Sequence, residues 1–362
     1  MKRIRVAICG SGNRSRTVWQ PYLRGFDGFE LVGVQDTNPE SLRQADAMGN
    51  VSAEHQYTDL HEMLANTQPD ALIVCSVNAA HASAIEAGLQ SKAHVLVEKP
   101  FTLELSNAIR LTRLAERERL VLGVVQNWRS KSVGRALRRA IAEGVIGRVS
   151  HIFFRYLRDR ELPHLPLYLF EEQDPLLYAM AIHHIDLFRY ILSQEIIRVE
   201  GRAFRPLWSR YREASGLQLW METDGGVVIS YAGTLSSRNG HLPQESLQVE
   251  GELGTLCNES EYSEPPLWHS KRGASSMIDL TADVIERDCK SQYALADMAI
   301  LRNFHAAITE GEPLIASALD NLGTLAVLEA ARKSYREQKT VNSKEVLPAV
   351  RLPICELELE IK

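Results

Sequence analysis

Short apolar runs and longer helical patterns alternate through the first third of the chain. The apolar runs are rich in β-branched residues and nearly continuous in hydrophobicity, which is typical of strands buried on both faces of a parallel sheet. They occupy residues 4–10, 29–36, 71–77, 94–100 and 120–127. Three helical patterns lie between them, at 38–49, 79–91 and 103–119. This alternation predicts right-handed βαβ units and a doubly wound parallel sheet.

The hydrophobic pattern changes after about residue 125. A helical pattern at 175–193 is followed by alternating strand-like runs, and Asp224-Gly225 between two of these runs suits a tight hairpin turn. Two further helical patterns close the chain, at 294–311 and 318–338. We therefore predict two domains, 1–124 and 125–362, the second an α+β domain built on a mostly antiparallel open sheet.

Composition narrows the class of protein. The formal net charge of -5 leaves no basic surplus to neutralise nucleic-acid phosphates. The five cysteines are scattered without a C-x-x-C pair, which indicates neither a disulfide framework nor a metal site. No uncharged stretch approaches the roughly 18 residues that span a membrane, and the first apolar run is too short for a signal peptide. These features predict a cytoplasmic protein that binds no nucleic acid, membrane or metal.

A glycine loop follows the first predicted strand. Gly10 permits a tight turn, and Gly12 lets the backbone approach a pyrophosphate at a helix N-terminus, with Asn13 and Arg14 beside it. G-x-G alone is weak, because a structural turn has the same pattern and Ser15 replaces the third glycine. The second strand, however, ends on Asp36, where an acid binds the adenosine ribose hydroxyls. Together these residues predict a Rossmann dinucleotide site.

Asp36 also bears on the choice of cofactor. A carboxylate at this position repels a 2′-phosphate, so NAD is predicted rather than NADP. Arg14 and Arg16 keep NADP open as the alternative, because either guanidinium could pair with that phosphate.

Charged residues close the fourth predicted strand, "HVLVEKP". Lys99 stands at the carboxyl end of a parallel strand, the edge where ligands of doubly wound sheets bind. A partly desolvated lysine facing a nicotinamide and a substrate hydroxyl could exchange the hydroxyl proton. The alternative is a solvated lysine that only closes the strand. Pro100 fixes the chain direction, and its peptide bond suits the cis form.

Several motifs together resemble one family, the glucose–fructose oxidoreductase/inositol dehydrogenase (Gfo/Idh/MocA) family. They are the glycine loop, Glu98-Lys99-Pro100, an Asn-x-x-His segment at Asn78 and His81, "AIHHID" at 181–186 and "GELGTL" at 251–256. The resemblance covers nearly the whole chain. It implies that Lys99 contacts both cofactor and substrate, and that further cofactor contacts come from Ser76, Asn78, His81, Glu98 and Asn127. Arg129, in "QNWRS", matches a family segment near the substrate cleft.

The helix with two histidines departs from the family pattern. The family usually carries an Asp four residues before a His and another Asp three residues after it. Here His183 and Asp186 match, whereas the first acid is replaced by Ala179. We expect His183 to assist Lys99 as acid–base partner or hydroxyl ligand, and Asp186 to contact the substrate or to orient the helix. The Arg-rich loop at 155–170 suits an anionic or polyhydroxylated ligand, a surface loop or a subunit contact equally well.

The sequence thus predicts a nicotinamide-dependent oxidoreductase that acts on a hydroxyl group of a sugar, inositol or sugar-derived acid. Ala179 keeps two alternatives open, a non-catalytic sensor of nucleotides or sugars and redox-neutral NAD-dependent chemistry. The second domain is expected to bind the substrate. Its open sheet is also expected to join the chain into a homodimer or homotetramer, because a bare apolar sheet face needs covering.

Overall fold

The computed structural model describes residues 3–48, 51–163, 165–238, 243–260, 264–280, 283 and 292–347. The chain divides into two compact units. Unit 1 comprises Met1–Gln126 and Asp297–Leu322, and unit 2 comprises Asn127–Ala296 and Gly323–Lys362.

Unit 1 is built on a parallel six-stranded sheet with the strand order β3-β2-β1-β4-β5-β6. This is the doubly wound order of a Rossmann domain, so the predicted fold class is confirmed. The interior strands are buried on both faces because they are almost wholly apolar. The strands are β1 (Ile4–Cys9), β2 (Phe29–Gln35), β3 (Gln56–Tyr57), β4 (Ala71–Val74), β5 (His94–Val97) and β6 (Leu122–Val124).

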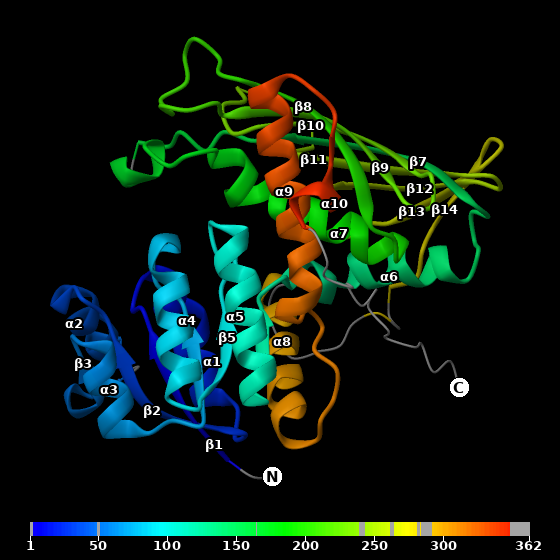
Figure 1. The fold of residues 1–362 in the computed structure, drawn as a ribbon. Helices are drawn as coiled ribbons and strands as arrows, with labels where there is room; N and C mark the ends of the chain where they lie inside the picture. Colours follow the sequence, from blue (N-terminus) through cyan, green and yellow to red (C-terminus); the bar gives the residue numbers. More distant parts are fainter. Residues whose placement is uncertain are drawn as a thin grey trace. The chain divides into compact units, whose positions relative to one another are not determined.

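Helices connect the strands of unit 1. Asn38 and Asp59 cap α2 and α3 by accepting backbone N–H bonds with their side chains, a role that short polar residues favour. Helices α4 and α5 lie side by side (Figure 1). The helical segments are η1 (Ser15–Trp19), α1 (Gln20–Gly25), α2 (Pro39–Ala47), η2 (Ala53–His55), α3 (Leu60–Thr67), η3 (Asn78–Ala80), α4 (His81–Gln90) and α5 (Leu105–Glu118).

A distant segment completes the core of unit 1. Helix α8 (Gln292–Thr309) buries Ile300, Leu301 and Phe304 in the same apolar cluster as residues of β1 and β2. The Phe304 ring stacks on Phe29 with a centroid distance of 6.4 Å. The boundary predicted at 124/125 stays a prediction. The structure adds that residues 297–322 group with unit 1, a packing that no local pattern encodes.

Unit 2 contains a nine-stranded sheet in the order β14-β13-β12-β11-β7-β10-β9-β8-β15. Only β7 and β10 pair in parallel, so the sheet is mixed but mostly antiparallel, as predicted. The strands are β7 (Val149–Leu157), β8 (Ile196–Phe204), β9 (Gly216–Thr223), β10 (Val228–Thr234), β11 (Glu245–Gly251), β12 (Thr255–Ser260), β13 (Trp268–Lys271), β14 (Ala274–Met277) and β15 (Val341–Asn342).

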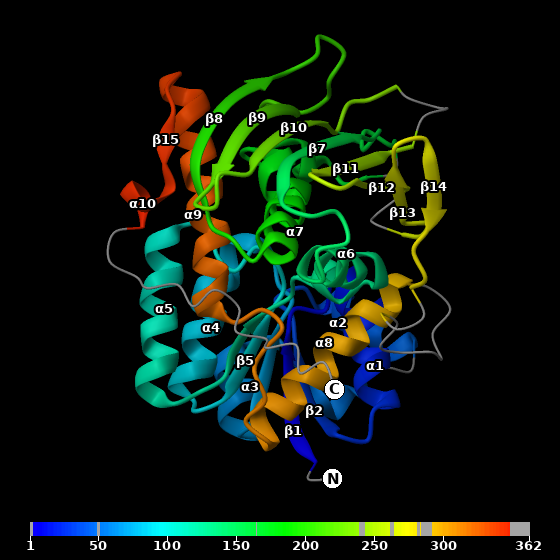
Figure 2. The same ribbon diagram turned by 90° about the vertical axis from the view of Figure 1, so that its right-hand side faces the viewer.

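One face of this sheet is covered by α7 (Ile182–Leu192), as Figure 2 shows. Burial alternates along β7 and β10, so every second side chain turns to the covered face. Phe154 and Tyr231 on that face contact the His184 ring of α7. The other helical segments of unit 2 are η4 (Asn127–Ser130), α6 (Ser132–Ala142), η5 (Leu167–Phe170), η6 (Leu177–Ala181), α9 (Ala318–Glu337) and α10 (Ser343–Val346), the first turn of α9 belonging to unit 1.

Candidate functional site

The glycine loop follows β1 and needs glycine at its first position. Gly10 has a φ of +99°, and a Cβ there would lie 2.6 Å from backbone atoms of Cys75 and Ser76. Any larger residue would therefore collide with the end of β4. Around Gly12, by contrast, nothing lies within 4 Å of a would-be Cβ. This open side leaves the room that a pyrophosphate needs to approach the backbone.

Asp36 follows the last residue of β2 and is fixed beside this loop. Its carboxylate accepts the Ser11 N–H at 2.7 Å and the Asn38 N–H at 2.8 Å. A carboxylate offers about four lone pairs, so acceptor capacity remains for ribose hydroxyls. The side chain is only partly buried. Arg16 donates to the Ser11 carbonyl oxygen and stabilises the same turn.

The helix after the loop begins at Asn13, which is exposed, and runs through η1 into α1. The segment η1 is π-helical, a wide turn that is frequent at functional sites. Its first backbone N–H groups are the kind that bind anions at a helix N-terminus. The loop, the open side at Gly12 and the position of Asp36 therefore fit a bound dinucleotide.

Glu98, at the carboxyl end of β5, is buried and anchored by two donors. Its Oε1 accepts Arg14 Nε at 2.7 Å and Trp19 Nε1 at 2.9 Å. Burial alone would raise the pKa of the Glu98 carboxyl, but the Arg14 guanidinium, Lys99 and the Trp19 N–H together hold it below its ordinary value. The carboxylate is therefore charged, and it ties the strand end to the helix after the glycine loop.

Lys99 is half-buried and lies between two fixed neighbours. On one side is Glu98. On the other, the Pro100 carbonyl lies 2.7 Å from His81 Nδ1, and the Lys99-Pro100 peptide bond is cis. The other ring nitrogen of His81 lies 3.1 Å from the Ser76 carbonyl oxygen. Both nitrogens of the buried ring thus face backbone oxygens, and burial lowers the pKa of His81. This side chain joins the loops after β4 and β5.

Asn78 opens η3 and is half-buried, as is Ser76. These two residues, His81 and Glu98 all come from the carboxyl ends of β4 and β5, so the fold brings the cofactor residues predicted in unit 1 to one edge of the sheet. Direct contacts of each with the cofactor stay predictions.

Sequence reasoning missed one partner in this unit, Asp297 of α8. Its fully buried carboxylate accepts Arg14 Nη2 at 2.8 Å. The Arg14 guanidinium is therefore shared between Asp297 and Glu98, and these ion pairs compete with the 2′-phosphate contact considered for NADP. No sequence signal could have found this pair, because 283 residues separate its members.

In unit 2, Arg129 and Asp186 are each other's partners. The Arg129 fork donates Nε to Oδ2 at 2.6 Å and Nη2 to Oδ1 at 2.7 Å, and both side chains are almost fully buried. Thr324 Oγ1 donates to the same Oδ1 at 2.8 Å. Direct substrate contact of the two residues stays a prediction. The geometry supports the orienting role considered for Asp186, because it fixes α7 one turn after His183.

His183 is buried and stacks on Trp128 of η4, with ring centroids 5.6 Å apart and an interplanar angle of 6°. The Lys131 ammonium lies 5.1 Å from the centroid of the same Trp128 ring and 3.4 Å from Glu264 Oε1. Asn127 is also buried in η4. Lys131 was not among the residues that the sequence singled out, since a lysine two positions after an arginine reads as solvated surface.

His184 is a core residue. It is fully buried among aromatic rings, its Nδ1 lies 3.1 Å from the Tyr231 hydroxyl, and burial lowers its pKa well below the ordinary value. The segment η6 before it is π-helical. A π-helical turn holds more residues than an α-helical one. The period of 3.6 residues per turn therefore does not tell whether position 179 and His183 lie on the same face. The i,i+4 relation inferred from the sequence is therefore not a plain α-helical one.

Comparisons with known proteins agree with this geometry. Residues 4–126 match the "Oxidoreductase family, NAD-binding Rossmann fold" model and residues 135–257 match the "GFO/IDH/MocA C-terminal domain" model. The chain belongs to the Gfo/Idh/MocA oxidoreductase family. The resemblance inferred from the sequence motifs is confirmed.

Relatives of similar length carry dehydrogenase names. A D-apiose dehydrogenase from Paraburkholderia graminis is 26% identical over 351 residues, covering 96% of this chain and 91% of the relative. A myo-inositol 2-dehydrogenase from Thermotoga maritima is 25% identical over 351 residues, covering 95% and 100%. An oxidoreductase from Agrobacterium radiobacter, solved in complex with NAD+, L-tartaric acid and magnesium, has the same fold, with a TM-score of 0.84 and 20% identity over 95% of this chain and 99% of that one.

This Gfo/Idh/MocA member is an NAD(P)-dependent oxidoreductase of the sugar and inositol dehydrogenase type, with the NAD-binding Rossmann domain of its family. The residues around the glycine loop fit that cofactor. In the described parts of the chain, no helix is both long and apolar enough to cross a membrane.

Proposed function

We propose that this enzyme oxidises a secondary hydroxyl group of a sugar, inositol or sugar-derived acid to a carbonyl, with Lys99 as the base and His183 as its acid–base partner. NAD+, when bound, accepts the hydride from the carbon that bears the hydroxyl. The hydroxyl proton passes to Lys99 and then to solvent, so one alcohol and one NAD+ give one carbonyl compound, one NADH and one proton.

The observation that carries this proposal is the fixed position of Lys99. Anchored Glu98 and the His81–Pro100 contact hold its backbone on both sides, at the carboxyl edge of the sheet where ligands bind. Preorganised geometry is a large part of what such an enzyme supplies. The names of the relatives support the substrate class. His183, stacked on Trp128, is held in one orientation, as an acid–base partner requires.

Ala179 supports a second candidate, a protein that binds NAD and a sugar without net oxidation, as a sensor or as a redox-neutral enzyme. The deciding experiment records NADH absorbance while the protein meets NAD and NADP separately with a panel of sugars, inositols and sugar acids. Rising absorbance is the expected result, with NAD as the better cofactor. Flat absorbance throughout, with NAD binding established by fluorescence, would overturn the oxidoreductase proposal in favour of the second candidate.

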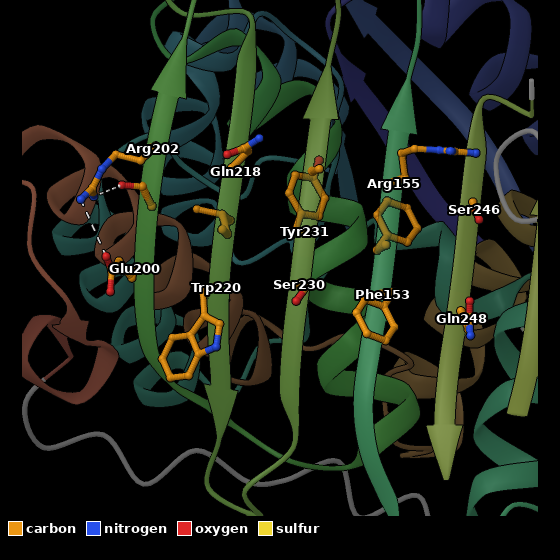
Figure 3. A pocket seen from close by; sticks show the side chains of 14 residues that line it. Phe153, Arg155, Glu200, Arg202, Gln218, Trp220, Ser230, Tyr231, Ser246 and Gln248 are labelled. Carbon is orange, nitrogen blue, oxygen red and sulfur yellow. Dashed lines mark hydrogen bonds and ion pairs between the residues drawn. The ribbon is translucent and has the colours of Figure 1, made fainter. Parts of the chain in front are cut away.

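We also propose that the uncovered face of the unit 2 sheet joins two copies of the chain. Phe153 and Trp220 are 47% and 38% exposed there, and the register places Ser230 between them and Gln248 beyond Phe153. Figure 3 shows this row of side chains, which lines a shallow depression of about 540 Å³. Two exposed aromatic rings on one sheet face, with only a serine between them, offer apolar area that a second copy could cover.

Phe153→Asp is therefore expected to convert a dimer or tetramer into monomers, because a charge in a packed apolar interface is not solvated. Light scattering coupled to size-exclusion chromatography measures the mass. Leu207→Asp is the matched control, since Leu207 is 97% exposed on a loop outside this row and should leave the mass unchanged. A native protein that elutes only as a monomer would contradict the proposal.

A further inference from the structure

Arg160 lies just beyond β7, where the chain continues its extended course beside β10. The Arg158 N–H donates to the Thr234 carbonyl at 3.1 Å, and the Arg160 N–H donates to the Leu235 carbonyl at 2.8 Å. The regular ladder ends here, because Asp159 and Ser236 form an isolated antiparallel bridge and residues 157–160 are all half-buried. The position of the Arg160 side chain is therefore given by its own contacts.

Side chains of β7 contact the histidine helix, and Arg160 contacts the segment before it. The rings of Phe154 and Tyr156 lie 4.5 and 5.0 Å from the His184 ring, and Arg160 Nη1 lies 3.9 Å from Met180 Sδ. Met180 directly follows Ala179, the position where the family usually has an aspartate. The Arg160 guanidinium is therefore next to the segment from which the acid is missing.

Arg160 differs from Arg238 and Arg212 in what its guanidinium contacts. Arg238 pairs with Asp159 at 2.8 Å, and Arg212 pairs with Glu171 at 3.5 Å. Within the described residues, the Arg160 guanidinium contacts the Met180 thioether, a weak acceptor, and forms no ion pair with a carboxylate. It is only partly exposed. A half-buried cation without an anion is unfavourable and is satisfied when a ligand supplies one.

We propose that Arg160 binds an anionic group of the substrate, so that this enzyme acts on sugar acids or sugar phosphates rather than on neutral polyols. The inference rests on the proposed function and narrows its substrate class. Ala179 is then an adaptation: an aspartate beside Arg160 would neutralise the guanidinium and repel the incoming anion. A planar guanidinium suits the oxygen pairs of both carboxylate and phosphate.

The test compares charged and neutral substrates of one size: D-galacturonate with D-galactose, D-gluconate with D-sorbitol, and D-glucose 6-phosphate with D-glucose. In the native enzyme, the charged member of at least one pair should have the higher kcat/KM. If that pair contains a sugar acid, the bound anion is a carboxylate, and if it contains the sugar phosphate, the bound anion is a phosphate. Arg160→Gln should lower kcat/KM for that charged substrate by about 10- to 100-fold, the usual effect of losing charge-assisted hydrogen bonds. Activity on the neutral partner and the Kd for NAD should stay unchanged.

Arg212→Gln is the matched control, because Arg212 lies in the adjacent loop but is 73% exposed and paired with exposed Glu171. This variant should leave kcat/KM unchanged for both the charged and the neutral substrate of each pair. Ala179→Asp is expected to reverse the preference, lowering activity on the charged substrate and raising it on the neutral one. The proposal is overturned if Arg160→Gln affects both members equally, or if the native enzyme prefers the neutral member of all three pairs.

Failure of the proposed function would be recognised separately. If absorbance stays flat for every substrate, the oxidation proposal fails, and calorimetric titration of the same acids and the sugar phosphate into the NAD-loaded protein decides about Arg160. Binding of one of the anions that weakens about 10-fold or more in Arg160→Gln but not in Arg212→Gln would support the anion site. Equal affinities in the native protein and Arg160→Gln, or no binding of any of the three anions, would overturn it.

Discussion

Lys99→Ala is expected to abolish turnover while the Kd for NAD stays within about tenfold of the native value, the effect of one lost polar contact. Turnover and NAD binding are expected to respond differently because of the residues that surround Lys99. Glu98 and Pro100 are held by other residues, so the strand end and the glycine loop keep their positions when the lysine side chain is removed. Only the group that takes the substrate proton is lost. NADH absorbance measures turnover, and fluorescence titration measures NAD binding.

Two variants make this result specific. Lys92→Ala removes an exposed lysine of the same unit that pairs with Glu118, and it should leave turnover unchanged. Lys99→Arg keeps the positive charge, but a guanidinium does not release its proton near neutral pH, so this variant should bind NAD and remain inactive. Turnover in Lys99→Ala within about tenfold of the native rate would remove this lysine from the mechanism.

The fold could be read from the sequence because its signals are local. Continuous β-branched runs and amphipathic stretches predict the Rossmann domain correctly, and the Asp224-Gly225 turn joins β9 and β10 as expected. The contribution of α8 to unit 1 could not be read in this way. Phe304 packs on Phe29 across 275 positions of the chain, and an apolar helix face does not state which sheet it will cover.

The position of a candidate site residue was predictable where the strand pattern determines the position of its backbone. Gly10, Asp36 and Lys99 lie at strand ends, and the ends of parallel strands share one edge. The arrangement of the side chains was less accessible. Arg14 could have served a phosphate or a carboxylate, and the choice depends on buried Asp297. The π-helical turn at Leu177–Ala181 could not be predicted from the sequence either, because the spacing of apolar residues is interpreted on the assumption of a regular α-helix.

Both ion-pair networks described here hold a residue that lies close along the chain to a proposed acid–base residue. Glu98 precedes Lys99 by one position, and Asp186 follows His183 by one helical turn. In each case an arginine from another segment, Arg14 or Arg129, binds the neighbour rather than the reactive group. The arginine thereby fixes the neighbouring residue, and with it the backbone close to Lys99 or His183. This arrangement suits a proton-transfer group, whose charge must change during the reaction.

Asp186→Ala is expected to destabilise the fold by about 3–5 kcal/mol, the usual consequence of removing one partner of a buried ion pair. The Arg129 guanidinium would lose both hydrogen bonds from its fork while remaining buried, and Thr324 would lose its acceptor. Urea unfolding followed by tryptophan fluorescence measures the free energy of unfolding. The signal reports mainly on unit 2, because four of the five tryptophans lie in its part of the chain.

The matched control is Asp159→Ala, which breaks a second Arg–Asp pair of unit 2 with an N–O distance of 2.8 Å. That pair with Arg238 is well exposed, at 53% and 37% for the two side chains, so its removal should cost only about 0–1 kcal/mol. Thr324→Val removes a single hydrogen bond to Asp186 and should cost about 1 kcal/mol. Equal losses in Asp186→Ala and Asp159→Ala would show that the buried fork does not hold α7. In that case the stacking of His183 against Trp128 would matter more for the orientation of its ring than the Arg129–Asp186 pair.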